Sequence, residues 1–275
     1  MRFAGISKVV VPVVAAVFGA AGGAVAEEGH FDALIFQDAG KVQVGGIDVA
    51  CFSGLEAPPC DPNGVSENIF EAELLETGTS PGLFGAAEEP GFFAVPDTAT
   101  SALPYGNPLG ANKTHSFDII LAPNSPVAGA SILFWDGTGP VSWSGVPASE
   151  FFDIEGNAGT GGTLTGTGTL TGIALDSTAS NGSFDTHPDF FLNGSGGADP
   201  TIGFYTLFGV TRIEGLAPSN PWGVVYDFGV ENEALHEAAV ENVAGFIPEP
   251  ATGTMLMLGL AGLAFHRRRG VRANA

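Results

Sequence analysis

The sequence predicts an all-β body: a single antiparallel β-sandwich or jelly-roll-like domain with one short amphipathic helix at its C-terminal end. Short runs rich in β-branched and aromatic residues recur along the chain. Turn-forming pairs such as Asn63-Gly64, Asp136-Gly137 and Asn181-Gly182 separate these runs. Because no helical segments alternate with them, a sandwich is favoured over a parallel α/β sheet.

Seven segments carry the strand pattern most clearly. In residues 114–121, polar and apolar side chains partly alternate before the run becomes wholly apolar, and residues 222–228 are rich in β-branched and aromatic types. A short strand is also expected at 190–192. The seven predicted strands are residues 31–37, 69–75, 114–121, 131–135, 169–175, 201–210 and 222–228.

Residues 231–244 show the pattern of an amphipathic helix. Leu235, Ala239 and Val243 recur at i, i+4 and i+8, so they share one face of a helix. Gly245 follows and is a residue type that often ends helices. We therefore expect a helix that packs its apolar face on the sheet.

Residues 159–172 are almost entirely glycine and threonine. Threonine at near-alternate positions favours an extended strand, whereas glycine weakens it and allows bulges. The tract is typical of a solvated hairpin at a sheet edge. A self-associating, adhesive strand is the alternative, because an exposed edge can pair with another chain.

The first 26 residues have the parts of a secretory signal peptide. Arg2 and Lys8 precede the short apolar run 9–18, and Ala24-Val25-Ala26 forms an A-x-A cleavage site. We expect the export machinery and signal peptidase to act here, leaving a body of residues 27–246. A retained membrane anchor is the alternative.

The C-terminal residues 247–275 form a second signal. Pro248, Glu249 and Pro250 are followed by the apolar stretch 251–265 and by a basic tail, 266–272, that contains Arg267, Arg268 and Arg269. Fifteen helical residues span about 22 Å, less than the ~30 Å hydrocarbon core, so this transmembrane helix inserts with some mismatch. The arginines place the tail in the cytoplasm.

These three parts, in this order at the chain terminus, resemble the PEP-CTERM sorting signal of bacterial exported proteins. The resemblance implies that a membrane-embedded exosortase recognises the tail, cuts near Pro248-Glu249-Pro250, and releases or transfers the body to the cell surface. It also implies a host that makes exopolysaccharide. An ordinary C-terminal membrane anchor is the alternative and has the same topology.

The chain is strongly acidic, with a formal charge of −21. Without residues 1–26 and 250–275, the remaining residues 27–249 keep three cations (Lys41, Lys113 and Arg212) against all 30 acidic residues, a net charge of −27. Such a surface excludes nucleic acid as a partner and attracts divalent cations, Ca²⁺ among them. A solvated acidic face that keeps the protein soluble is the plainer interpretation, and no cofactor is expected.

Two cysteines and one short polar motif complete the candidate residues. Cys51 and Cys60 are an even pair in an exported chain, which predicts a disulfide. Asp185, His187 and Asp189 stand at alternate positions and would share one face of an extended segment, as metal ligands do. A polar loop is the alternative for these three residues.

The motifs that identify common enzymes are absent or incomplete. Gly78-Thr79-Ser80-Pro81-Gly82 matches G-x-S-x-G, but Pro81 lacks the N–H that an oxyanion hole needs, so a turn is expected. We therefore expect a non-catalytic structural or adhesive protein of the cell surface or extracellular matrix, linked to exopolysaccharide. A carbohydrate-binding module or a polysaccharide hydrolase is the alternative. Exposed aromatic residues beside paired acids would favour this alternative, and buried tryptophans with a uniformly polar surface would favour the structural role.

Overall fold

The computed structural model describes residues 32–46, 68–97 and 108–247. Within these residues the chain is mainly β-strand, with one α-helix, α3 (Glu233–Ala244). The strands are β1 (Ala33–Asp38), β2 (Lys41–Gly46), β3 (Ile69–Glu73), β4 (Leu75–Thr77), β5 (Phe84–Ala87), β6 (Phe92–Ala94), β7 (Thr114–Ile119), β8 (Ile132–Trp135), β9 (Ser144–Gly145), β10 (Glu150–Glu155), β11 (Gly161–Leu164), β12 (Leu170–Ser177), β13 (Phe184–Thr186), β14 (Asp189–Gly194), β15 (Gly203–Ile213) and β16 (Trp222–Phe228).

The described strands form three sheets. A four-stranded sheet has the order β13-β6-β1-β2, and a five-stranded sheet has the order β11-β10-β14-β5-β4. A seven-stranded sheet has the order β12-β7-β15-β16-β3, and β8 also pairs with β15 and carries β9. Two pairs, β1 with β6 and β16 with β3, are parallel, and the other pairs are antiparallel.

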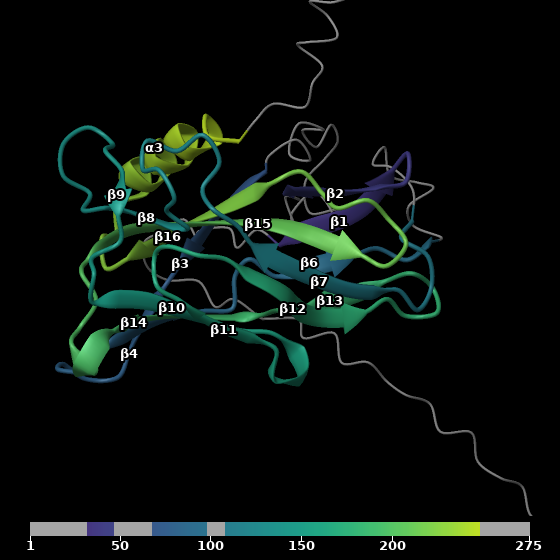
Figure 1. Cartoon of the computed structure of the whole chain (residues 1–275), viewed down its shortest axis with the longest axis horizontal. Coiled ribbons are helices and arrows are strands. Elements are labelled where there is room, and N and C mark those ends of the chain that lie inside the picture. Colours follow the sequence, from purple (N-terminus) through teal and green to yellow (C-terminus); the bar gives the residue numbers. More distant parts are fainter. Residues whose placement is uncertain (1–31, 47–67, 98–107, 248–275) are drawn as a thin grey trace, which may run out of the picture.

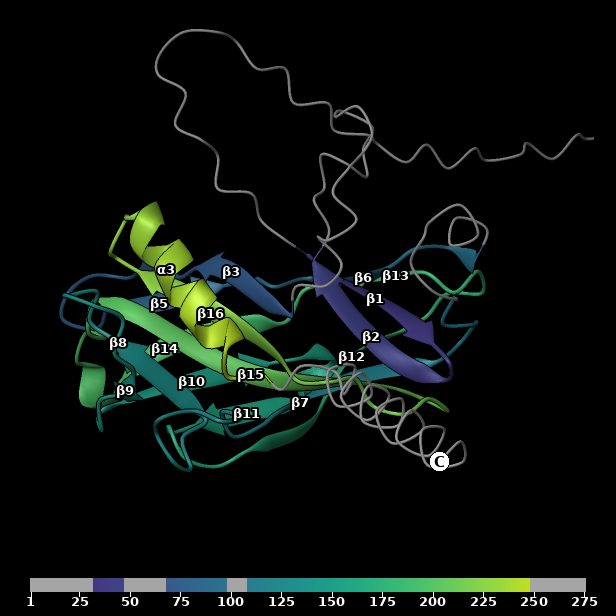
Figure 2. The same ribbon diagram turned by 90° about the horizontal axis from the view of Figure 1, so that it is seen from above.

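The seven-stranded sheet is the central layer. Its inner face shares one hydrophobic core with both the four-stranded and the five-stranded sheets, because buried residues of all three belong to the same cluster, including Phe92, Phe117 and Phe190. Figure 1 shows the five-stranded sheet below this layer and α3 above it. Figure 2 shows the four-stranded sheet at the end of the molecule away from α3. The arrangement is a sandwich with a helix on its outer side.

Helix α3 covers the outer face of the central layer. Its buried residues Ala239 and Val243 pack in a second core with residues of β8, β15 and β16. The side chain of Asn232 caps the helix by accepting a hydrogen bond from the Leu235 N–H at 3.2 Å. His236 is 3% exposed and bonds the Val225 carbonyl at 2.9 Å, so a polar contact fixes the helix on β16.

The predicted β-rich, sandwich-like body with one C-terminal helix is confirmed. The strand 222–228 has both predicted ends, and the predicted helix begins two residues later than expected, at Glu233. The two parallel pairs were not expected from an antiparallel sandwich. Long connections join their strands, and a long connection allows a parallel return that a tight hairpin does not.

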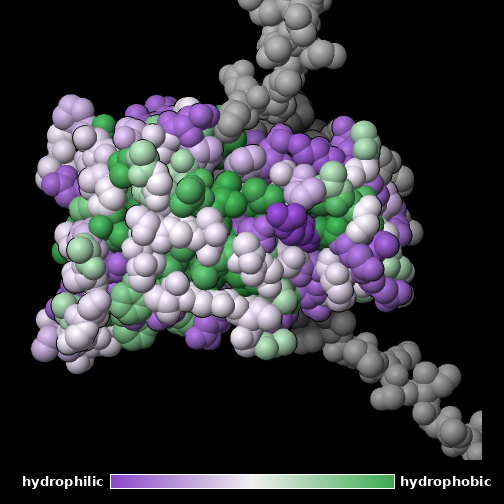
Figure 3. All heavy atoms as spheres, in the orientation of Figure 1, coloured by the Kyte–Doolittle hydropathy of each residue, from purple (hydrophilic) through white to green (hydrophobic). Residues whose placement is uncertain are grey.

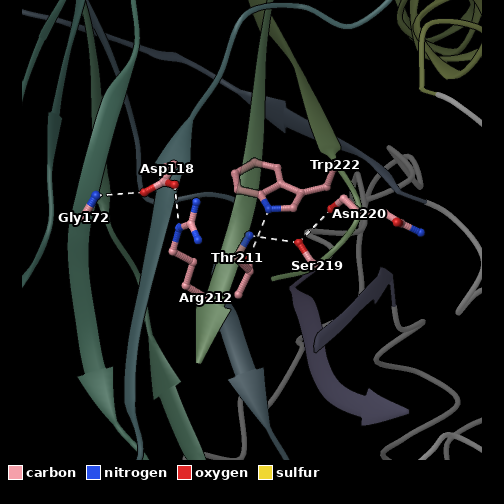
Figure 4. A network of polar contacts seen from close by, with 7 residues as sticks. All are labelled: Asp118, Gly172, Thr211, Arg212, Ser219, Asn220 and Trp222. Carbon is pink, nitrogen blue, oxygen red and sulfur yellow. Dashed lines mark hydrogen bonds and ion pairs between the residues drawn. The ribbon is translucent and has the colours of Figure 1, made fainter. Parts of the chain in front are cut away.

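The hairpin of β15 and β16 carries the central polar network, which Figure 4 shows. Trp222 is fully buried, and its Nε1–H donates to Thr211 Oγ1 at 3.1 Å. The Thr211 N–H donates to Ser219 Oγ at 2.9 Å. On the neighbouring strand, Asp118 accepts hydrogen bonds from Arg212 Nε at 2.6 Å and from the Gly172 N–H at 2.9 Å.

The glycine- and threonine-rich tract forms β11 and the start of β12, which lie at the edges of two different sheets. Groups along β12 are already bonded to the preceding loop: the Ala174 N–H donates to Thr160 Oγ1 at 2.8 Å, and Asn157 Nδ2 donates to the Leu175 carbonyl. Because these groups have partners within the chain, the edge is a poor template for a second chain at this point.

Candidate functional site

The candidate site lies at the seam between the four-stranded and five-stranded sheets. The chain crosses this seam twice, from β5 to β6 through residues 88–91 and from β13 to β14 through residues 187–188. On one side Ala87 is opposite Phe190, and on the other Phe92 is opposite Thr186. Between these pairs the ladder is interrupted, and each crossing contains a proline, which has no N–H to donate.

Three potential metal ligands gather in this gap. Asp32 directly precedes β1, and Glu89 and His187 come from the two crossings. One ligand atom of each residue lies within 4.8 Å of the other two. Asp32 and Glu89 are half-buried and His187 is exposed. The fold therefore brings two carboxylates and an imidazole from distant parts of the sequence to one point.

Hydrogen bonds tie the start of β1, the first crossing and the central layer together around the site. The Ala33 N–H donates to the Gly91 carbonyl at 2.8 Å, which ties the start of β1 to the first crossing. The Gly91 N–H donates to Glu89 Oε2 at 3.0 Å. Tyr226 lies on β16 in the central layer, and its hydroxyl donates to the Glu89 carbonyl at 2.9 Å. The site is thus built on ordered strand ends.

The charges in the seam repel one another in part. Burial, followed by the nearby carboxylate of Glu89, raises the pKa of the Asp32 carboxyl above its usual value, and His187 partly offsets this effect. His187 Nε2 lies 3.5 Å from Asp185 Oδ1, and this aspartate is largely exposed. His187 Nδ1 lies 3.2 Å from the Glu88 carbonyl oxygen, which only accepts, so Nδ1 carries the proton of this contact.

The sequence motif Asp185, His187 and Asp189 is divided by the fold. Asp185 and His187 lie together, but Asp189 begins β14, where it is opposite Glu155 of β10. Pro188 separates the two strands, so the alternation that would align the three side chains does not continue. Asp32 and Glu89 take part instead. No local sequence pattern marks Glu89 or Asp32 as a ligand. Only the pairing of distant strands brings these two residues to His187.

A pocket of about 540 Å³ opens beside the seam. Asp32 and Asp185 belong to both the pocket wall and the seam, and Asp176 adds a third carboxylate. Phe93 and Phe184 supply aromatic surface. The pocket therefore combines acidic and aromatic side chains next to the candidate metal ligands.

The serine of the G-x-S-x-G match lies in a loop, as predicted for a turn. Ser80 Oγ donates to the Asp199 carboxylate, which also accepts from the N–H groups of Gly82 and Leu83, both at 2.8 Å. These hydrogen bonds lower the pKa of Asp199. The serine thus helps to hold a loop, and its partner is an acid rather than a histidine base.

Several sequence predictions fall outside the described residues. These are the signal peptide 1–26, the Cys51–Cys60 disulfide, the motif Pro248, Glu249 and Pro250, the apolar stretch 251–265 and the arginines Arg267, Arg268 and Arg269. Where the structure does describe the chain, its helices lack the length and hydropathy of a membrane span.

The C-terminal segment has a family match. Residues 246–269 match the PEP-CTERM protein-sorting motif, in agreement with the resemblance of the tail, and no curated protein matches the chain. The match begins at Phe246, two residues after the end of α3. The chain is therefore an exported protein that carries a PEP-CTERM sorting signal for an exosortase, attached directly to a sandwich-like β body.

Proposed function

We propose that the body is a non-catalytic structural or adhesive component of the cell surface or extracellular matrix, delivered there by export and exosortase processing. The observation that carries this proposal is the sorting motif at 246–269, which follows the folded body without a linker. A signal of this kind supports delivery of the body to the cell envelope, which is where a structural or adhesive component acts.

The burial of the tryptophans in the body supports a structural role. Trp135, Trp143 and Trp222 are at most 7% exposed, so each tryptophan stabilises a core instead of forming a ligand platform. The surface is mixed: on the face drawn in Figure 3, apolar residues reach the surface near the middle, and hydrophilic residues gather toward the end where β1, β2 and β13 lie. The surface is therefore not uniformly polar, and the buried tryptophans are the feature that favours the structural role.

Processing is tested by replacing Pro248, Glu249 and Pro250 with alanine. The unchanged protein should be found outside the inner membrane, with an intact mass for a chain that begins at Glu27 and ends near Pro248. The triple variant should stay in the inner membrane and keep Arg267–Arg269, because the exosortase no longer recognises it.

The matched control is Pro140→Ala, in an exposed loop of the body, which should be processed normally. Normal release of the triple variant would show that the motif does not direct processing. Retention of the unchanged protein with its arginines would identify a plain C-terminal anchor.

A second candidate function is polysaccharide binding by the body. The pocket favours it, because aromatic and carboxylate groups side by side are the usual means of binding sugars: Phe93 stands beside Asp176 and Asp185. Under this alternative, Phe93→Ala should reduce retardation of the protein in gels that contain the host exopolysaccharide. Equal retardation of both proteins would contradict polysaccharide binding by this pocket, and the structural role would be the remaining candidate.

A further inference from the structure

The three side chains at the seam offer the ligand set of a metal site. Asp32 and Glu89 supply carboxylate oxygens and His187 supplies an imidazole nitrogen, with one ligand atom of each within 4.8 Å of the others. Calcium and magnesium prefer sites made of oxygen ligands alone, whereas a nitrogen ligand among carboxylates suits Zn²⁺ and similar transition metals. The ligand types therefore favour zinc over calcium.

The histidine is held in the tautomer that a metal requires. Its Nδ1 donates to the Glu88 carbonyl at 3.2 Å, so in the neutral ring Nε2 keeps the free lone pair. Metal-binding histidines usually donate their second ring nitrogen to such an outer partner. Glu89 has an equivalent support, because its Oε2 accepts from the Gly91 N–H at 3.0 Å. Outer contacts thus orient two of the three ligands.

The space between the ligands depends on a missing side chain. Gly91 is buried, and a Cβ added to it would collide with both Asp32 Oδ1 and the His187 ring. A glycine at this position therefore lets Asp32 Oδ1 and the Cε1–Nδ1 edge of the His187 ring approach each other. Any larger residue at position 91 would fill this space without removing a ligand.

We propose that Asp32, Glu89 and His187 bind one divalent transition-metal ion, with zinc as the favoured ion, at the seam between the two smaller sheets. Asp185, 3.5 Å from His187 Nε2, is the nearest outer carboxylate. The ion joins the start of β1 to both crossings and neutralises two acids in a segment, residues 27–249, with a net charge of −27. This inference does not depend on the proposed structural role.

The test is a zinc titration of the protein purified from the producing cells, after dialysis against a chelator, at pH 7.5. Calorimetry should show one equivalent of zinc bound to the unchanged protein, and its melting temperature should rise with zinc. His187→Ala and Glu89→Gln should each weaken binding at least tenfold, as expected when a ligand is lost. Gly91→Ala should weaken it similarly although all three ligands remain.

Asp189→Asn is the matched control, because it removes a carboxylate from the same segment that is not one of the three ligands and is opposite Glu155 of β10. It should bind zinc like the unchanged protein. The melting temperature of each variant without zinc shows whether it is folded, and Asp32→Asn, which removes repulsion between two acids, should stay folded and still lose zinc.

Three results would overturn the proposal. If zinc produces no heat and no change in melting temperature, Asp32 and Glu89 are satisfied by a shared proton instead of a metal ion. If zinc binds equally well to His187→Ala, the metal is held elsewhere on the chain. Stronger binding of calcium than of zinc would contradict the role of the imidazole.

Discussion

His115 is a buried side chain without the partners that its polarity calls for. It lies on β7, 1% exposed, with its ring centroid 4.5 Å from that of Phe184 and 5.9 Å from that of Phe92. Within the described residues neither of its ring nitrogens has a hydrogen-bond partner. Burial lowers the pKa of His115 to about 3, so the ring is neutral in the folded protein at neutral pH.

This burial predicts acid sensitivity. Unfolded, His115 has its ordinary pKa of 6.5, so between pH 6.5 and about 3 the unfolded state binds a proton that the folded state does not. The free energy of unfolding therefore falls as the pH falls through this window, by at most about 1.4 kcal/mol per pH unit from this group. His115→Leu should remove this component.

Urea unfolding of both proteins at several pH values between 7.5 and 4.5 measures the effect. At pH 7.5 the variant should be at least as stable, because leucine leaves no polar atom unsatisfied in the core. If the difference in free energy of unfolding between the two proteins stays constant down to pH 4.5, the histidine is solvated or paired in solution.

At the scale of elements, Asp118 repairs a break in the ladder between β7 and β12. The register shifts between Leu170 and Ile173, and Asp118 Oδ1 accepts the Gly172 N–H at 2.9 Å in this interval. The other oxygen pairs with Arg212 of β15, whose side chain is half exposed. One carboxylate thus links three neighbouring strands.

Replacements of Asp118 should separate these two contributions. Asp118→Leu leaves the Gly172 N–H without its acceptor and should lower the free energy of unfolding by about 2–3 kcal/mol. Asp118→Asn keeps an acceptor for the Gly172 N–H but turns an NH2 group toward Arg212, so the ion pair and its hydrogen bond are both lost. Because the Arg212 side chain is half exposed and can turn to solvent, this loss should cost about 1 kcal/mol or less. Urea denaturation compares the two variants, and equal losses would show that the bulge does not depend on this hydrogen bond.

The sequence predicts both ends of β16 because β-branched and aromatic residue types run through the strand. The structure buries all of its residues. Strand β10 is not among the segments with the clearest strand pattern, and Glu150 occupies one of its core-facing positions. Glu150 is 4% exposed and accepts hydrogen bonds from the Tyr205 hydroxyl at 2.7 Å and the Thr201 N–H at 2.9 Å. A polar core position that only distant partners satisfy cannot be recognised from local alternation.

The seam could not be predicted from the sequence for a related reason. Periodicity reports which side chains of one segment share a face, and on that basis it indicates His187 as a candidate ligand residue. It carries no information about which segments pair, so Asp32 and Glu89 could not be placed beside it. The sorting signal, by contrast, is a contiguous motif and was recognised in full.

At the scale of the whole molecule, the described body ends at the residue that directly precedes the processing motif in the sequence. Ile247 is 9% exposed in the outer core, and the next residue is Pro248 of the motif. Trp143 Nε1 donates to Asn242 Oδ1 at 3.0 Å, and Asn124 Nδ2 donates to the Phe246 carbonyl at 3.2 Å. The described body is thus held by packing and hydrogen bonds up to Ile247, and the motif Pro248-Glu249-Pro250 follows at the next residue of the sequence.

This arrangement predicts that the spacing between body and motif limits the rate of processing. A six-residue Gly-Ser insertion between Ile247 and Pro248 supplies a flexible segment of about 12–15 Å, which lets the motif reach the protease without steric interference from the body. Pulse–chase labelling should show processing several-fold faster, with an unchanged melting temperature. The same insertion between Gly139 and Pro140, in an exposed loop, should not change the rate. If the insertion before Pro248 slows processing instead, the protease contacts the body itself, and α3 belongs to the recognised surface.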